Sequence, residues 1–205
     1  MKHFLLALTL LSGFAFGAET WTIDDTHSTA RFKVKHLLVT NVSGEIAGVA
    51  GKFTLDGDDL TKMTIDAKAD VRTINTNNKK RDEHLRAEDF FMTKKHPWTT
   101  FKSKSVKKDG AKYLIVGDLT LRGVTKEVTL ESEGLTPAVK DPWGSIRRSF
   151  TGTTKINRKD YGVSFNKTLD NGGAVVGDEV TVEIEAEIKT DAPKDAAPKA
   201  EPKKS

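Results

Sequence analysis

The chain has 205 residues, and its 33 Lys and Arg against 29 Asp and Glu give a formal net charge of +4. An excess this small and this evenly spread does not favour a nucleic-acid-binding protein. The chain contains no cysteine, which excludes disulfides and lipoprotein acylation. We therefore expect one domain that is stabilised by an ordinary hydrophobic core.

The N-terminal segment has the pattern of a secretory signal peptide. Lys2 precedes an apolar run from Phe4 to Phe16, and Gly17 and Ala18 supply small residues for cleavage. The run is shorter than the roughly 18 to 20 apolar residues of a membrane span, which argues against the alternative of a retained anchor. We predict a signal peptide over residues 1–18 and a periplasmic mature protein, because export without disulfides suits that compartment.

From Trp21 onward, most of the chain alternates apolar and polar residues with a period of two, as half-buried strands do. Residues 30–36 place Ala, Phe, Val and His on one face, and residues 180–188 give the cleanest alternation. Turn sequences such as Arg122-Gly123 separate the segments at hairpin length. About eight such strands predict an all-β antiparallel sandwich or barrel.

Several of the predicted inward rows contain small residues. If the sheet closes on itself, an eight-stranded barrel has room for one small ligand, and small side chains enlarge that room. Strand bending or a tapered barrel explains the same residues equally well, so the pattern leaves both interpretations open. The small residues are Ala30, Gly44, Ala67, Ala69, Ser103, Gly117, Gly152 and Thr154.

One polar segment interrupts the strands. Residues 78–87 contain no Gly or Pro and predict a short helix, with Thr76 or Asn77 as its N-cap. The helix has few apolar residues of its own and is followed by Phe90 and Phe91. A helix this polar cannot carry a core, so we expect it to cross a sheet edge or to cover a hollow.

Arg81, Asp82 and His84 form the densest polar cluster of the chain. We favour a hydrogen-bond network that fixes the helix to the barrel rim, with direct ligand contact and acid–base catalysis as alternatives. No nucleophile motif or phosphate-binding loop accompanies the cluster, so we predict no catalytic residue. The histidines lack the spacing of paired metal ligands, and we predict no metal site.

The C-terminal residues 191–205 are Ala, Pro, Lys and acidic residues without an apolar anchor. Such a composition does not bury enough apolar surface to offset the entropy of ordering. We predict a disordered Lys/Ala/Pro tail there and a single barrel domain over residues 19–190.

Short motifs in a fixed order run through almost the whole predicted domain, and their order and spacing together are specific. The chain resembles the YceI-like family of periplasmic polyisoprenoid-binding proteins. It departs from the family pattern at His96, where a tyrosine is usual, and in its additional tail. The motifs are Trp21-Thr-Ile-Asp24, Val34-Lys-His36-Leu37, Arg81-Asp82-Glu-His84-Leu85, Asp89-Phe90-Phe91, Gly117-Asp-Leu119-Thr-Leu-Arg-Gly123, Ile156-Asn-Arg158 and Val176-Gly-Asp178.

The resemblance implies an antiparallel, eight-stranded, lipocalin-like barrel with one short helix between strands and a long apolar pore. It implies a bound isoprenoid or quinone-like lipid rather than a catalytic cofactor. We expect Arg81, Asp82 and His84 at the polar rim. The predicted ligand-binding residues are Phe32, Val34, His36, Ile65, Ala67, Phe90, Phe91, Phe101, Ile115, Leu119, Phe150 and Ile156.

We predict that the protein binds, transports or sequesters a polyisoprenoid or similar long-chain amphiphile in the periplasm. One alternative is an enzyme that acts on isoprenoid lipids with Arg81, Asp82 and His84 at the pore mouth. Another is a stress-related module that contacts a protein partner through its lysine-rich faces or its tail. A homodimer formed along an edge or a face stays open, and the sequence does not identify the lipid head group.

Overall fold

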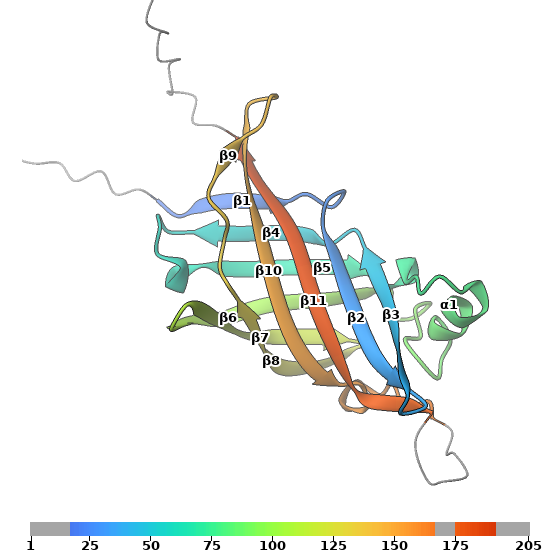
Figure 1. Cartoon of the computed structure of the whole chain (residues 1–205). Helices are drawn as coiled ribbons and strands as arrows, with labels where there is room; N and C mark the ends of the chain where they lie inside the picture. The colour runs from blue at the N-terminus through green and yellow to red at the C-terminus, as the bar shows by residue number, and fades with distance from the viewer. Residues whose placement is uncertain (1–16, 167–174, 192–205) are drawn as a thin grey trace, which may run out of the picture.

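A computed structural model describes residues 17–166 and 175–191, in which long antiparallel strands wrap around an interior (Figure 1). The one α-helix of this part is α1 (Lys79–Leu85), and the 3-10 turns are η1 (Leu60–Lys62), η2 (Val71–Thr73) and η3 (Arg158–Tyr161). The strands are β1 (Glu19–Ile23), β2 (Thr29–His36), β3 (Thr40–Ala47), β4 (Ala50–Leu55), β5 (Thr64–Asp70), β6 (Trp98–Asp109), β7 (Lys112–Leu121), β8 (Val124–Ser132), β9 (Val139–Lys140), β10 (Ser145–Asn157) and β11 (Val176–Asp191).

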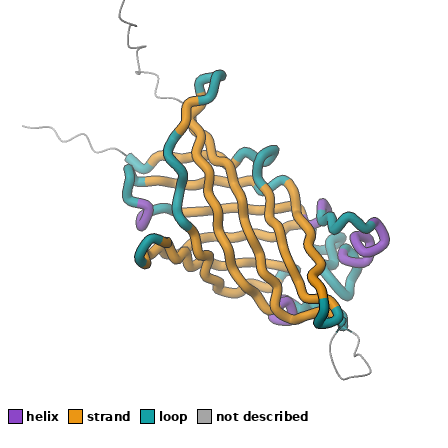
Figure 2. The backbone as a smooth tube through the Cα atoms, viewed as in Figure 1, coloured by secondary structure: helices purple, strands orange, loops and turns teal. Residues whose placement is uncertain are grey.

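The sheet closes on itself through β11. In the described residues the ring runs β11, β1, β4, β5, β6, β7, β8, β10 and back to β11, with antiparallel pairing throughout. The hairpin of β2 and β3 joins the ring where β2 pairs with the N-terminal part of β11, and it extends the wall toward α1 (Figure 2). The prediction of an eight-stranded antiparallel barrel with one short helix is confirmed, and the sandwich alternative is excluded.

The first strand begins where the predicted domain begins, and the last strand ends one residue beyond its predicted end. β1 begins at Glu19, and β11 pairs with β10 as far as Asp191, which lies opposite Ser145. β11 therefore includes Asp191, the first residue of the segment predicted as the tail. Residues 1–16 of the predicted signal peptide and residues 192–205 of the predicted tail lie outside the described residues.

The alternation of inward and outward side chains is interrupted in the middle of β6. The pairing of β6 with β7 shifts between Ser103 and Ser105, so two residues of β6 oppose one of β7, as in a β-bulge. Ser105, which would point inward if the alternation continued from Ser103, is exposed, and Val106 takes the buried position opposite Ile115. Ser103 does point inward, where its hydroxyl accepts a hydrogen bond of 2.8 Å from the Ile65 amide.

The helix begins one residue later than its predicted cap. The Asn78 side chain, rather than that of Thr76 or Asn77, caps α1 by accepting a hydrogen bond of 3.0 Å from the Arg81 amide. Thr76 is instead buried and bonded to Asp82, and Asn77 has a positive φ of 60°. Thr76, Asn77 and Asn78 all have side chains that suit an N-cap, but only Asn78 caps the helix.

A network of charged residues ties the β1–β2 loop to β10 and β11. Ligand atoms of Asp24, His27 and Glu187 lie within 4.8 Å of one another, the only such group found among the described residues. Arg147 Nη1 lies 2.9 Å from Asp24 Oδ2 and also bonds Glu187, and Lys189 Nζ lies 3.0 Å from Asp24 Oδ2. Two cationic side chains thus already neutralise these carboxylates, which makes the group an ion-pair network.

Candidate functional site

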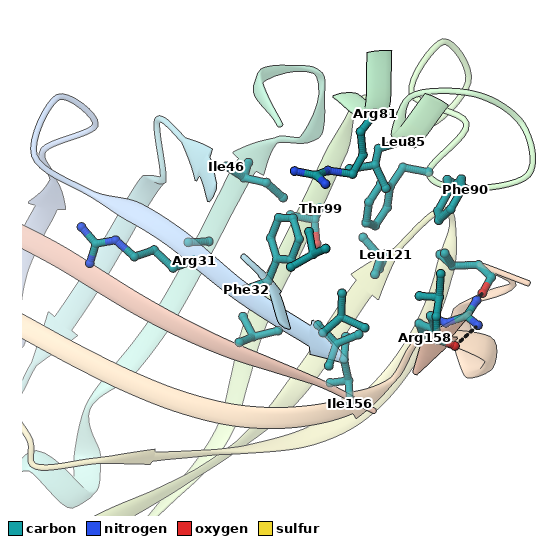
Figure 3. A pocket seen from close by; sticks show the side chains of 18 of the residues that line it. Arg31, Phe32, Ile46, Arg81, Leu85, Phe90, Thr99, Leu121, Ile156 and Arg158 are labelled. Carbon is teal, nitrogen blue, oxygen red and sulfur yellow. Dashed lines mark hydrogen bonds between the residues drawn. The ribbon is translucent and has the colours of Figure 1, made fainter. Parts of the chain in front are cut away.

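An apolar cavity of about 220 Å³ lies between β2, β11 and the segment that runs from α1 to Phe91. Phe32 of β2 and Ile156 of β10 reach into it from the two strands that flank β11, and Leu85 and Phe90 cover it from the side of the helix (Figure 3). A second cavity of about 90 Å³ adjoins it in the direction of β4 and β5. The two cavities share the lining residues Thr99, Leu119, Val182 and Ile184, so they are neighbouring parts of one interior pore.

Eleven of the twelve predicted ligand-binding residues line this pore. Ile115 does not, because it is fully buried in the core between β6 and β8, opposite Val106 and Leu130. Phe90 and Phe91 both line the first cavity, as expected for rim residues. The first cavity contains Phe32, Val34, His36, Phe90, Phe91, Leu119 and Ile156, and the second contains Ile65, Ala67, Phe101, Leu119 and Phe150.

The prediction omitted the wall that β11 contributes. Val180, Val182 and Ile184 line the first cavity, and the last two also line the second. The signal for them was present, because residues 180–188 alternate more cleanly than any other segment. Ile46 and Leu121 line the first cavity and were omitted as well, although each lies two residues after a predicted inward residue, Gly44 and Leu119.

The predicted polar rim divides into a structural part and a part that lines the pore. Asp82 is buried and lines neither cavity; its Oδ1 accepts hydrogen bonds from the Thr76 amide at 2.8 Å and the Thr76 hydroxyl at 2.5 Å. Arg81 donates from Nε to the Thr76 hydroxyl at 2.7 Å and from Nη2 to the Thr76 carbonyl at 2.8 Å. These hydrogen bonds form the network that fixes the helix. Arg81 belongs to this network and also lines the first cavity.

His84 also lines the first cavity. Its Nε2 lies 2.7 Å from Asp89 Oδ2, and its ring packs edge-on against Phe90 and Phe165, with 4.9 Å between ring centroids in each case. Arg81 and His84 also line a shallow hollow on the outer side of α1, together with Lys80. These two side chains therefore form the boundary between the apolar pore and the surface.

A model of the YceI-like domain matches residues 21–188. The chain belongs to the YceI-like family. It is 38% identical over 192 residues to the protein YceI of Escherichia coli O157:H7, covering 90% of this chain and 97% of the relative. It is also 38% identical over 167 residues to a UPF0312 protein of Photorhabdus laumondii, covering 78% of this chain and 86% of that one.

Three solved structures have a similar fold. A YceI protein of Campylobacter jejuni has a TM-score of 0.61 at 29% identity, covering 78% of this chain and 91% of that one. BcnA of Burkholderia cenocepacia has a TM-score of 0.69 at 20% identity, covering 80% and 98%. A domain of Saccharophagus degradans described as polyisoprenoid binding has a TM-score of 0.58 at 17% identity, covering 84% and 98%. The last two likenesses concern the fold alone.

Arg158 of the YceI-like Ile-Asn-Arg motif has a structural role in the wall of the first cavity. It is only 4% exposed, and burial lowers the pKa of its guanidinium from the ordinary value, an effect that Asp178 opposes. All of its N–H groups have protein acceptors, so it has no donor left for a ligand. The acceptors are the carbonyl oxygens of Val163, Phe165, Val176 and Gly177 and the Asp178 carboxylate.

The YceI-like pore is thus suited to an elongated apolar molecule with one polar end. Most of the pore lining is aliphatic or aromatic, and Arg81 and His84 lie where the pore meets the surface beside α1. Among the described residues, no helix has the length and apolar character needed to cross a membrane.

Proposed function

We propose that the protein binds a polyisoprenoid or similar long-chain amphiphile in the pore and carries or sequesters it in the periplasm. The observation that carries this proposal is the pair of adjoining cavities, lined almost throughout by aliphatic and aromatic side chains. The relative from Saccharophagus degradans, described as polyisoprenoid binding, lends support through its fold. The signal-peptide pattern of residues 1–18 supports the location.

Burial of the apolar chain supplies the driving force. Each Å² of apolar surface that leaves water contributes roughly 25 cal/mol, before the cost of immobilising a chain with many rotatable bonds. Contacts of this kind distinguish length and bulk better than chemical identity. The pore therefore accepts a class of long apolar chains, and the polar end decides among them.

Arg81 is the residue best placed to meet that polar end. Its Nε and Nη2 each donate to Thr76, and its Nη1 makes no hydrogen bond with the described residues. A phosphate or carbonyl oxygen at the boundary would accept from Nη1, since guanidinium groups suit such acceptors. A head group held there would leave the chain in the two cavities.

Native mass spectrometry tests the proposal. Protein that is stripped of lipid by organic extraction is offered polyprenyl phosphate or ubiquinone and should take up one molecule. Val182→Phe narrows the junction of the two cavities and should weaken uptake roughly ten-fold or more. Thr181→Phe places the same ring on the outer face of β11 and should leave uptake unchanged. Protein that contains no lipid when purified and takes none up afterwards contradicts the proposal.

The His84–Asp89 pair favours a second candidate, an enzyme that acts on the bound lipid. The pair adjoins the pore, and Asp89 orients the imidazole as a carboxylate does beside a general base. Among the described residues, however, no serine lines either cavity to serve as a nucleophile. His84→Ala distinguishes the two functions, because an enzyme would lose turnover while lipid uptake continued. A binding protein would show no turnover in either form.

A further inference from the structure

The hairpin between β2 and β3 ends in three consecutive apolar residues that face solvent. Leu37 is 39% exposed, Leu38 58% and Val39 82%. Single exposed apolar side chains are ordinary, but a run of three at a projecting tip needs a functional explanation. We call residues 37–39 the apolar tip.

Turn geometry does not explain the choice of leucine. Leu37 and Leu38 have φ angles of 52° and 62°, and the Val39 amide donates to the His36 carbonyl at 3.1 Å. A tight turn with two left-handed central residues favours Asn and Gly. Bulky side chains in this region are rare outliers. The tip thus displays two leucines where the backbone favours small or polar residues.

Basic residues precede the apolar tip on β2. Residues 29–44 include Arg31, Lys33 and Lys35 and no acidic residue. Lys33 and Lys35 are exposed, and neither forms an ion pair within the described part of the chain. Near the tip, Lys33 faces Thr181 and Ser43, and Lys35 faces Asn41. The acidic residues Glu183 and Glu45 face Arg31, further from the tip, and Glu179 and Asp178 of β11 are paired with Lys155 and with Arg158 and Lys159. The surface at this hairpin is consequently cationic.

The tip adjoins the pore. His36, the residue before Leu37, lines the first cavity and pairs with Val176, which lines it too. Figure 1 shows the end of the β2–β3 hairpin at the opposite end of the barrel from β9. A partner that takes up the apolar tip therefore lies next to the cavity in which the amphiphile is held.

We propose that the apolar tip inserts into the head-group region of an anionic bilayer, with Lys33 and Lys35 on the lipid phosphates. Three apolar side chains with a basic collar match the composition of an interfacial membrane contact. They are too few for a stable protein interface, which buries roughly 800 Å² on each partner. The inference rests on the proposed function only for its purpose, which is to bring the pore to the membrane where the amphiphile resides.

Vesicle flotation tests the contact without any cargo. Lipid-free protein is mixed with vesicles of phosphatidylethanolamine and phosphatidylglycerol, and its N terminus is read by mass so that residues 1–18 are known to be absent. Leu38→Asp combined with Val39→Asp should lower membrane partition roughly ten-fold. The matched control is Val139→Asp combined with Trp143→Asp, which removes side chains that are 64% and 84% exposed at the far end of the barrel. The control should float like the parent protein.

Two further variants separate the contribution of the lysine charges to vesicle binding from that of the apolar side chains. Lys33→Gln with Lys35→Gln should remove the preference for phosphatidylglycerol over phosphatidylcholine vesicles. Leu38→Trp keeps the tip apolar, and its additional fluorescence should shift to shorter wavelength on vesicles. If the parent protein does not float, if the tip and control pairs lose partition equally, or if the added tryptophan does not shift, the proposal is wrong.

Lipid uptake distinguishes this inference from the proposed function. The Leu38→Asp/Val39→Asp protein should still take up polyprenyl phosphate added from ethanol but should extract it more slowly from vesicles. Normal uptake with no vesicle binding in any form refutes the membrane contact and leaves the pore assignment intact. Vesicle binding without uptake refutes the pore assignment alone. Binding of the tip to a second copy or to another protein, with no affinity for vesicles, refutes the bilayer as partner.

Discussion

The ring of Phe32 lies so close over Gly44, its partner on β3, that a Cβ at position 44 would meet the ring Cζ at 2.5 Å. Phe101 covers Gly117 in the same way, also at 2.5 Å from a Cβ. The space that a side chain would occupy at Gly44 and Gly117 is therefore filled by neighbouring aromatic rings. They let phenylalanine side chains lie flat along the wall, which leaves the open volume between the walls.

Gly44→Ala should lower the free energy of unfolding by about 2 kcal/mol, because the added methyl group forces Phe32 toward the cavity. The displaced ring should also reduce lipid uptake. Urea denaturation measures the first effect and native mass spectrometry the second. Ser43→Ala, on the exposed face of the same strand, is the control and should change neither. Phe32→Leu added to Gly44→Ala should restore part of the stability; a double variant less stable than Gly44→Ala would contradict the packing argument.

The barrel and most of its lining could be predicted because both depend on alternation. Phe32 and Val34 on β2, or Phe150 and Ile156 on β10, follow a period of two that closure turns into an interior wall. Alternation does not predict which side chains point inward where one strand has an extra residue, as between Ser103 and Ser105, because no local sequence feature marks the bulge. It also does not separate an inward side chain that lines a cavity from one that fills the core, which is why Ile115 was misplaced. The small residues of the inward rows were ambiguous for a related reason, because the rings that fill their space come from neighbouring strands.

Asp24 should make the barrel sensitive to acid. The Thr26 hydroxyl, Lys189 and Arg147 hydrogen-bond its carboxylate and hold its pKa well below the ordinary 3.8, against the opposing effect of burial. Because the pKa is lower in the folded state, the ionised form stabilises the fold above about pH 4, and this contribution is lost as the pH falls further. Asp24→Asn should cost about 3 kcal/mol at pH 7, the low end for breaking a buried ion pair.

Thermal denaturation of the parent protein and Asp24→Asn between pH 7 and pH 3 checks this. The gap between the two stabilities should begin to narrow below about pH 4, because the unfolded Asp24 then binds a proton that the folded carboxylate, with its lowered pKa, does not bind. Asp25→Asn removes a neighbouring exposed carboxylate and is the matched control. A constant gap across the pH range would show that Asp24 acts through its shape and hydrogen bonds rather than its charge.

Tyr161→Phe should stabilise the protein. Tyr161 is 1% exposed, burial raises the pKa of its phenol to about 12, and its hydroxyl has no hydrogen-bond partner within the described residues. An unsatisfied buried hydroxyl is unfavourable, so its removal should raise the free energy of unfolding by about 1 kcal/mol. Denaturant titration measures the change. A loss of stability would mean that the hydroxyl is bonded in solution, to an ordered water for example.

Replacing the apolar tip with ordinary turn residues should separate stability from membrane contact. Leu37→Asn with Leu38→Gly suits the left-handed angles of both positions and should raise the free energy of unfolding by about 2 kcal/mol. The same variant removes two apolar side chains from the tip, so its flotation with anionic vesicles should fall. Leu37→Ala with Leu38→Ala loses the apolar side chains but keeps a Cβ at both left-handed positions, and it should lose flotation without the gain in stability. If the Asn-Gly hairpin were more stable and floated as well as the parent protein, the leucines would have no role at the membrane.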